Sequence, residues 1–350
     1  LLAAAQAMRQ SGLWQAGYTL LGIDDGWAAA DRDAAGNLVA DGQKFPAGLH
    51  ATVAALHRLG FAVGIYGDMG TQTCGGGPGS YQYEAQDARW FAAQGLDYVK
   101  MDWCATAGLD APTRYARMSQ AITATGRPMT FSLSNWGRQD PWQWAPALAN
   151  SARTTTDIDG ISDEDNFTET YNSYHWTCLV KNLEGNQHPE VVGPGFANDP
   201  DCLQVGTGFF DTQQEEVAQL QLWAVMGAPM LLGLDVRTVT DETLRLLTHP
   251  MLCAINQDPL ALQGRRVKEE HGSEVWLKPL ADQQSYAMVL FNRTDQQATA
   301  SITWLDIWSN VTSAYVRDIW QGTELGTQPG GFGAQLAPHA SMLLQVAPQT

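Results

Sequence analysis

The sequence predicts an α/β fold, a (β/α)8 barrel followed by a C-terminal antiparallel β-sandwich. Short apolar strands alternate with helices through most of the 350 residues. These strands end in polar or acidic residues, as in barrels that hold functional groups at the carboxyl ends of their strands. From about residue 264 the pattern changes to short alternating runs, which is typical of a sandwich. The predicted domains are residues 1–263 and 264–350.

The barrel prediction depends on seven strand-then-helix units in chain order. Several strands are continuous apolar runs, as expected for strands covered on both faces. A doubly wound open sheet is the alternative, and it is weakened because no Gly-rich phosphate fingerprint follows the first strand. The predicted strands are 18–23, 61–68, 98–104, 129–136, 152–159, 193–201 and 229–235, and the predicted helices are 2–16, 51–59, 84–94, 112–125, 170–183, 213–226 and 240–247.

The sandwich prediction depends on runs in which apolar and polar residues alternate between turn residues. We expect no metal site in this domain, because its residues lack metal-ligand spacing. The predicted strands are 274–278, 285–291, 300–304 and 341–346.

Composition excludes several classes of function. The chain has 20 Lys and Arg against 37 Asp and Glu, a net charge of -17, which argues against nucleic acid and anionic membrane surfaces. No run of 18 apolar residues occurs, so we expect no transmembrane helix. Residues 1–9 lack a basic segment, and we expect an amphipathic helix there rather than a signal peptide.

Acidic residues collect at the predicted strand ends. Such a set fits a divalent cation site, a site for a polyhydroxylated ligand, or a catalytic pair of carboxyl groups. A metal is the weaker interpretation, since the His residues form no HxH or HExxH pattern. Sugar hydroxyls suit ionised acceptors, and glycoside hydrolysis needs two carboxyl groups in different protonation states. The residues are Asp24, Asp25, Asp68, Asp102, Asp157, Asp159, Asp199, Asp201 and Asp235.

Six ordered stretches between residues 18 and 262 carry a family resemblance. They are Ile23-Asp24-Asp25-Gly26-Trp27, Phe45-Pro46-Ala47-Gly48, Gly64-Ile65-Tyr66-Gly67-Asp68 with Thr73-Cys74, Lys100-Met101-Asp102-Trp103-Cys104, Asn198-Asp199-Pro200-Asp201 and Ala254-Ile255-Asn256-Gln257-Asp258-Pro259-Leu260. Together they resemble the retaining α-galactosidases of glycoside hydrolase family 27, which also includes α-N-acetylgalactosaminidases.

The resemblance implies a role for each matching position. Asp102 matches the nucleophile and Asp157 the general acid/base. Cys74 and Cys104 match a disulfide beside the nucleophile, which favours an oxidising compartment. The implied sugar contacts are Asp24, Asp25, Tyr66, Lys100, Asn135, Trp136, Arg153 and Asp201. The resemblance leaves Cys178, Cys202 and Cys253 unassigned, and we expect buried, inert thiols.

The implied mechanism is a double displacement without a metal or organic cofactor. Asp102 must be ionised to attack the anomeric carbon, and Lys100, two residues earlier on the same strand face, favours that charge. Asp157 must start protonated, and we expect Arg153 to pair mainly with substrate or another acid. In a retaining enzyme the two carboxyl groups lie about 5–5.5 Å apart.

Three features depart from the family pattern. The family's first barrel strand is expected to have no counterpart in this chain. Asn135 stands where the family often has Glu, and Trp103 where it often has Gly. We favour galactose as the sugar removed, from oligosaccharides, galactomannans or glycoconjugates. The alternatives are an α-N-acetylgalactosaminidase, a β-L-arabinopyranosidase, an isomaltodextranase, or a galactose-binding protein without turnover.

The expected partner is a carbohydrate with a terminal α-galactoside, and a homodimer is left open. Three sequons begin at Asn166, Asn292 and Asn310 and permit glycosylation. With the implied disulfide they predict a glycoprotein that is secreted or lysosomal or vacuolar, with its signal peptide outside this chain.

Overall fold

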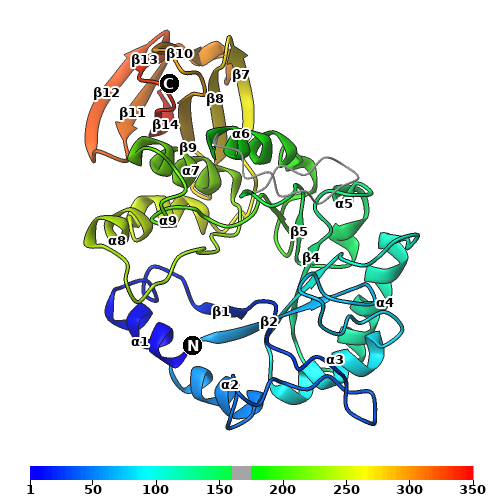
Figure 1. Cartoon of the computed structure of the whole chain (residues 1–350). Helices are drawn as coiled ribbons and strands as arrows, with labels where there is room; N and C mark the ends of the chain where they lie inside the picture. Colours follow the sequence, from blue (N-terminus) through cyan, green and yellow to red (C-terminus); the bar gives the residue numbers. More distant parts are fainter. Residues whose placement is uncertain (160–174, 350) are drawn as a thin grey trace. The chain divides into compact units, whose positions relative to one another are not determined.

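The computed structural model describes residues 1–159 and 175–349, which divide into two compact units, Leu1–Thr155 and Thr156–Thr350 (Figure 1). The sequon residue Asn166 and the first part of the predicted helix 170–183 lie outside the described residues. None of the described helices is both long enough and apolar enough to cross a membrane.

The first unit contains parallel strands joined by helices. The strands β1 to β5 pair in chain order, each with the next. In this register Asp68 lies beside Asp102, and Asp102 beside Ser134, at the carboxyl ends of three neighbouring strands. The elements are α1 (Leu2–Gln10), β1 (Leu20–Ile23), α2 (Leu49–Arg58), β2 (Ala62–Asp68), α3 (Glu84–Gln94), β3 (Tyr98–Asp102), α4 (Ala111–Ala124), β4 (Thr130–Ser134), α5 (Pro141–Trp144), the 3-10 turn η1 (Ala145–Ala147) and β5 (Ser151–Arg153).

Local sequence explains where several of these elements begin and end. Gly95 adopts φ +83, which a left-handed C-terminal cap requires, and ends α3. Asp110 begins α4 by accepting a hydrogen bond from the Thr113 N–H. The predicted helix 2–16 ends early, at Gln10, because Gly12 at φ +88 leaves the helical region.

The second unit begins with helices and one short strand. The elements are α6 (His175–Gly185), η2 (Pro189–Val191), β6 (Ala197–Asp199), α7 (Gln213–Met226), α8 (Asp241–Leu247) and α9 (Pro250–Asn256). Helix α7 starts with a capping box, in which Thr212 and Glu215 each accept a hydrogen bond from the other's backbone N–H.

The late strand predictions are partly wrong. Residues 229–235 form no regular strand, and their pairing is one isolated parallel bridge between Leu203 and Leu232. Pro229 has no N–H to donate to a ladder, which disfavours a longer strand. The predicted strands 152–159 and 193–201 shorten to β5 and β6, and Pro200 directly follows β6.

The C-terminal part of the second unit is all β. One antiparallel sheet has the order β12-β11-β14-β9-β8-β7, and β10 pairs with β13 in a second sheet. The four predicted runs correspond to β8, β9, β10 and β14; the other four strands were not predicted. The strands are β7 (Arg265–Glu270), β8 (Ser273–Pro279), β9 (Tyr286–Asn292), β10 (Ala298–Thr303), β11 (Ser313–Asp318), β12 (Thr323–Pro329), β13 (Gly331–Leu336) and β14 (Ser341–Gln349), with the 3-10 turn η3 (Trp304–Asp306).

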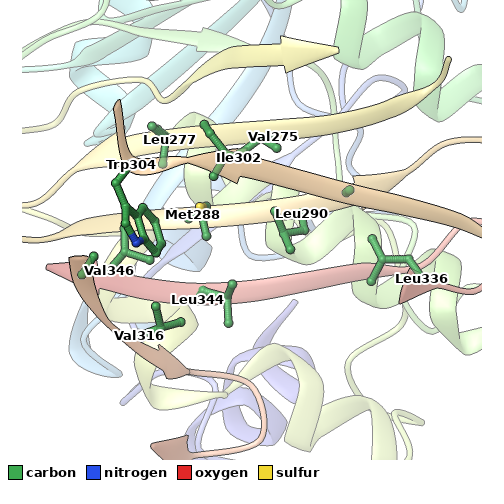
Figure 2. Close-up of a cluster of buried hydrophobic side chains, with 12 residues drawn as sticks. Val275, Leu277, Met288, Leu290, Ile302, Trp304, Val316, Leu336, Leu344 and Val346 are labelled. Carbon is green, nitrogen blue, oxygen red and sulfur yellow. The ribbon is translucent and has the colours of Figure 1, made fainter. Parts of the chain in front are cut away.

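A hydrophobic core lies between these strands. Figure 2 shows apolar side chains from β8, β9, β10, β11 and β14 gathered with Trp304. Trp304 is fully buried, and its indole N–H donates to the Gln328 carbonyl at 2.7 Å. Burying such a large ring with its polar atom hydrogen-bonded stabilises the domain.

We expect Trp304→Ala to lower the free energy of unfolding by about 3–5 kcal/mol, because it leaves a cavity and an unsatisfied carbonyl. Leu305→Ala is the matched control, since Leu305 is 61% exposed and should change stability by less than about 0.5 kcal/mol. Urea unfolding of the two variants measures the difference. Equal small losses would show that Trp304 is not a core residue.

Candidate active site

Asp102 ends β3 as a buried carboxyl group, 6% exposed. The Trp103 backbone N–H donates to its Oδ1 at 3.0 Å, and Cys74 Sγ lies 3.6 Å from its Oδ2. The Tyr115 hydroxyl donates to the Met101 carbonyl at 3.0 Å, and the Tyr115 ring stacks on Trp103. The carboxyl group is therefore fixed by the Trp103 N–H, and the strand end that carries it is held by the Tyr115 hydroxyl.

The disulfide between Cys74 and Cys104 is present, with a Cα–Cα distance of 5.2 Å. It joins the loop after β2 to the loop after β3, next to Asp102. Cys178 and Cys253 are buried, and burial raises the pKa of both thiols, in keeping with an inert role. Cys202 is half-buried rather than buried, and Gln204 Nε2 lies 3.7 Å from its Sγ.

Lys100 connects two of the implied sugar contacts. Its Nζ lies 3.3 Å from Asp24 Oδ2 and 5.3 Å from the centre of the Tyr66 ring. The Asp24 side chain is 70% exposed, whereas Tyr66 is 2% exposed. A cation, a carboxylate and a phenol therefore lie close together. Such a group of donors and acceptors suits a ligand with several hydroxyl groups.

Asp25 differs from its neighbour Asp24. Its Oδ1 accepts the Gly26 N–H at 2.6 Å, and its Oδ2 accepts the Gly75 N–H at 2.7 Å. Asp25 therefore connects the loop after β1 to the loop after β2, which carries Cys74. Trp27 ties the loop after β1 to β2 by donating its indole N–H to the Tyr66 carbonyl at 2.8 Å.

Asn135 and Trp136 lie in the loop after β4. Asn135 is fully buried, and its amide N–H donates to the Arg138 carbonyl in the same loop. Trp136 has φ +56, an uncommon conformation for a large side chain. Gly137 lies so close to β5 that an added Cβ would be 2.3 Å from the Thr154 carbonyl oxygen. The loop is therefore held tightly against the strand that carries Arg153.

Arg153 is the last residue of β5 and is 4% exposed. Its Nη2 donates to the Thr155 carbonyl at 3.2 Å, and its own carbonyl accepts the Gly137 N–H at 3.2 Å. A buried guanidinium group at a strand end is a strong donor for a carboxylate or a hydroxyl oxygen.

Asp157 and Asp201 lie in the second unit. The Asp201 carboxylate accepts the Ile158 N–H at 2.8 Å, directly after Asp157. Lys181 donates to the Asp157 carbonyl at 3.1 Å and to the Thr156 hydroxyl at 2.7 Å. Asp201 and Lys181 thus hold the peptide group between Asp157 and Ile158, and Lys181 also holds the Thr156 side chain.

Sequence reasoning did not find Lys181 or Asn182. Both are on α6, and Asn182 donates to the carbonyls of Thr156, at 3.3 Å, and Pro200, at 2.8 Å. The sequence signal for them is weak, because a Lys-Asn pair on a helix is ordinary. The contacts arise only when α6 packs beside the Asp157 segment.

Asp68 was found as a strand-end acid but received no role. It is fully buried, and burial raises its pKa to about 8. Hydrogen bonds from the backbone N–H groups of Gly70 and Cys104 lower the pKa of Asp68, whereas the charges of Asp102 and Asp25 raise it further. Burial and the charges of Asp102 and Asp68 also raise the pKa of Tyr66.

The raised pKa of Asp68 predicts a pH-dependent stability. The folded chain binds this proton more tightly than the unfolded chain, whose pKa is near 3.8. The stabilisation is therefore fully present below about pH 4 and is lost as the pH rises to about 8. We expect Asp68→Asn to lose less stability than the natural chain between about pH 5 and about pH 7. Urea unfolding of the variant and of the natural chain at both pH values measures the free energy of unfolding. Equal losses of this free energy in the two proteins would contradict the expectation.

The structure also bears on the metal and glycan predictions. In the described part of the chain the candidate metal-ligand group is Asp68, Cys74 and Cys104, and its two sulfur atoms are bonded to each other. The sequon residue Asn292 is fully buried and donates to the Gln296 and Ala337 carbonyls at 2.7 and 2.9 Å. Asn310 is exposed.

Comparison with known proteins gives consistent matches over the whole chain. Residues 1–258 match the family described as "Alpha galactosidase A", and residues 270–346 match "Alpha galactosidase C-terminal beta sandwich domain". A "Probable alpha-galactosidase" of Dictyostelium discoideum is 40% identical, over 98% of this chain and 86% of the relative. An "Alpha-galactosidase" of Cyamopsis tetragonoloba is 37% identical, over 99% and 81%.

Solved structures agree with these sequence matches. The crystal structure of alpha-galactosidase I from Mortierella vinacea has a TM-score of 0.90 and 31% identity, covering 100% of this chain and 93% of that one. The predicted fold class, a (β/α)8 barrel followed by a β-sandwich, is therefore confirmed. The chain belongs to the α-galactosidase A family, which is glycoside hydrolase family 27.

Proposed function

We propose that this chain is a retaining glycoside hydrolase that removes terminal α-linked galactose from oligosaccharides, galactomannans or glycoconjugates. The observation that carries this proposal is the position of Asp102, a buried carboxyl group at the end of β3 beside the Cys74–Cys104 disulfide. The chain around it is 37–40% identical to α-galactosidases over nearly its whole length.

In the proposed mechanism Asp102 attacks the anomeric carbon and forms a covalent galactosyl intermediate. The Trp103 N–H donates to Asp102 Oδ1 at 3.0 Å, which fixes the direction of the carboxylate. Asp24, Tyr66 and Lys100 are proposed to bind the sugar hydroxyls. Their mixture of donors and acceptors matches a ring that carries several hydroxyl groups.

We propose Asp157 as the general acid/base. It protonates the leaving oxygen in the first step and deprotonates water in the second. Asp201 and Lys181 support this role, since they fix the peptide group between Asp157 and Ile158. Asp102 and Asp157 belong to different units, and their separation of about 5–5.5 Å stays a prediction.

Five further residues are proposed to contact the sugar. They are Asn135, Trp136, Arg153, Asp25 and Asp201. Arg153 is supported by its burial at the end of β5, and Asn135 and Trp136 by their tight loop beside that strand. Asp25 and Asp201 each also hold a backbone N–H, so we expect their variants to lower stability as well as affinity.

The domain boundary, the compartment and the assembly are further proposals. We place the boundary between residues 263 and 264, just before β7 begins at Arg265. The disulfide supports a secreted, lysosomal or vacuolar chain. Within the two sequons that the structure describes, exposed Asn310 is the proposed glycan site, because buried Asn292 is not accessible. A homodimer stays a prediction, and sedimentation of the purified chain tests it.

A panel of p-nitrophenyl glycosides tests the proposed substrate. We expect release from the α-D-galactopyranoside, with little or none from the α-N-acetylgalactosaminide and the β-L-arabinopyranoside. Preferred release from either of the other two would move the specificity to that sugar. Galactose binding without release from any of them, by a folded sample, would support the alternative of a binding protein.

A further inference from the structure

The residue beside the proposed nucleophile is a second buried acid. Asp68 ends β2 as Asp102 ends β3, and the two are register partners. Asp68 is 0% exposed and therefore cannot touch a sugar in solution. Placing two carboxyl groups side by side is unfavourable when both are charged, so this position requires a physical explanation.

Asp68 uses both of its oxygens to hold backbone. Oδ1 accepts the Gly70 N–H at 2.6 Å, in the loop after β2. Oδ2 accepts the Cys104 N–H at 2.8 Å, in the loop after β3. One side chain therefore clamps the same two loops that the Cys74–Cys104 disulfide joins covalently.

The clamped loops have little room to move. A Cβ added at Gly70 would lie 1.9 Å from the Cys104 carbonyl oxygen, so the two backbones touch. The Asp102 carbonyl also accepts the Met69 N–H at 2.9 Å. A shift of Cys104 must therefore move its neighbour Trp103, whose N–H binds Asp102 Oδ1 at 3.0 Å.

We propose that Asp68 is a positioning residue for the nucleophile, which fixes the direction of the Asp102 carboxylate through the Cys104 and Trp103 backbone. This inference rests on the proposed function of Asp102. Misplacing a reacting group by about 1 Å costs on the order of 100-fold in rate. Asp68 is buried and its two oxygens bind backbone N–H groups of Gly70 and Cys104, so substrate affinity should change little.

Asp68→Asn is the sharpest test, because asparagine keeps the shape but has one acceptor oxygen for two N–H groups. We expect kcat on p-nitrophenyl α-galactopyranoside to fall about 100-fold while KM changes less than about threefold. The loss of kcat should be larger when the disulfide is reduced, because the covalent link between the two loops is then removed too.

Asp97→Asn is the matched control. Asp97 also accepts a backbone N–H, from Val63 at 2.9 Å, but it precedes β3 and so lies at the other end of that strand. We expect it to lower the melting temperature and leave kcat within about twofold. Equal losses of kcat in Asp68→Asn and Asp97→Asn would overturn the positioning role.

Hydrogen exchange separates this proposal from the proposed function. The Cys104 and Trp103 amides should exchange faster in Asp68→Asn than in the natural chain, and the amides in the sandwich should not change. Unchanged exchange at Cys104 contradicts the clamp whether or not the natural chain is active. An inactive but folded natural chain refutes only the proposed function. If Asp68→Asn and Asp68→Ser both fail to fold, Asp68 is a purely structural residue and the proposal is wrong.

Discussion

Asp102→Ala is expected to lower kcat/KM for α-galactoside hydrolysis by about 10⁴-fold, or about 5 kcal/mol of transition-state stabilisation. Without this carboxylate no group at the end of β3 can form the covalent intermediate. Galactose binding should remain, because Asp24, Tyr66 and Lys100 are unchanged. Steady-state kinetics with galactose-binding calorimetry measures both quantities, and circular dichroism verifies the fold.

A small anionic nucleophile sharpens this result. Azide added to Asp102→Ala can occupy the space of the lost carboxylate and attack the anomeric carbon while the leaving group departs. The expected product is β-galactosyl azide, formed with inversion. Unchanged turnover of the variant without azide would remove Asp102 from the nucleophile role.

Asp157→Ala is expected to lower kcat/KM about 10³-fold for melibiose, whose leaving oxygen needs a proton. The loss for p-nitrophenyl α-galactopyranoside should be much smaller, because p-nitrophenolate departs without protonation. The ratio of the two kcat/KM values therefore measures the acid role. Since kcat/KM reports the first step, slower release of the covalent galactosyl group does not mask the difference.

Asp159→Ala is the control for this series, because Asp159 is an exposed acid two residues further along the same segment. We expect Asp159→Ala to change kcat/KM for both substrates by the same factor. If Asp157→Ala lowers kcat/KM equally for the two substrates, Asp157 is not the general acid. The loss then reflects the backbone contacts with Asp201 and Lys181.

The early strands could be predicted because their burial is visible in the sequence itself. Residues 61–68 end in Asp68 and residues 98–104 contain Asp102, and they form β2 and β3 with those acids at the strand ends. The later strands are shorter than predicted because prolines such as Pro200 and Pro229 remove ladder donors. Strand β12 was missed since it is rich in Thr and Gly and lacks alternation. Strand β13 does alternate Phe332, Ala334 and Leu336 with Gly and Gln, so its sequence could have predicted it.

The candidate site could be predicted as a set of residues but not as a set of contacts. Asp24 and Asp68 look alike in sequence, yet the Asp24 side chain is 70% exposed and Asp68 is fully buried. The clamp from Asp68 to Cys104 spans 36 residues, and the contact from Lys181 to Asp157 spans 24. Such contacts depend on how loops and helices pack, which no local pattern records.

The measurement that tests the central claim most directly is the anomeric form of the first product. The purified chain is mixed with p-nitrophenyl α-D-galactopyranoside, and proton NMR follows the sugar before its anomers equilibrate. A retaining double displacement by Asp102 and Asp157 predicts that α-galactose appears first and β-galactose only later. If β-galactose appears first, or a folded sample releases no galactose, the proposed mechanism is wrong.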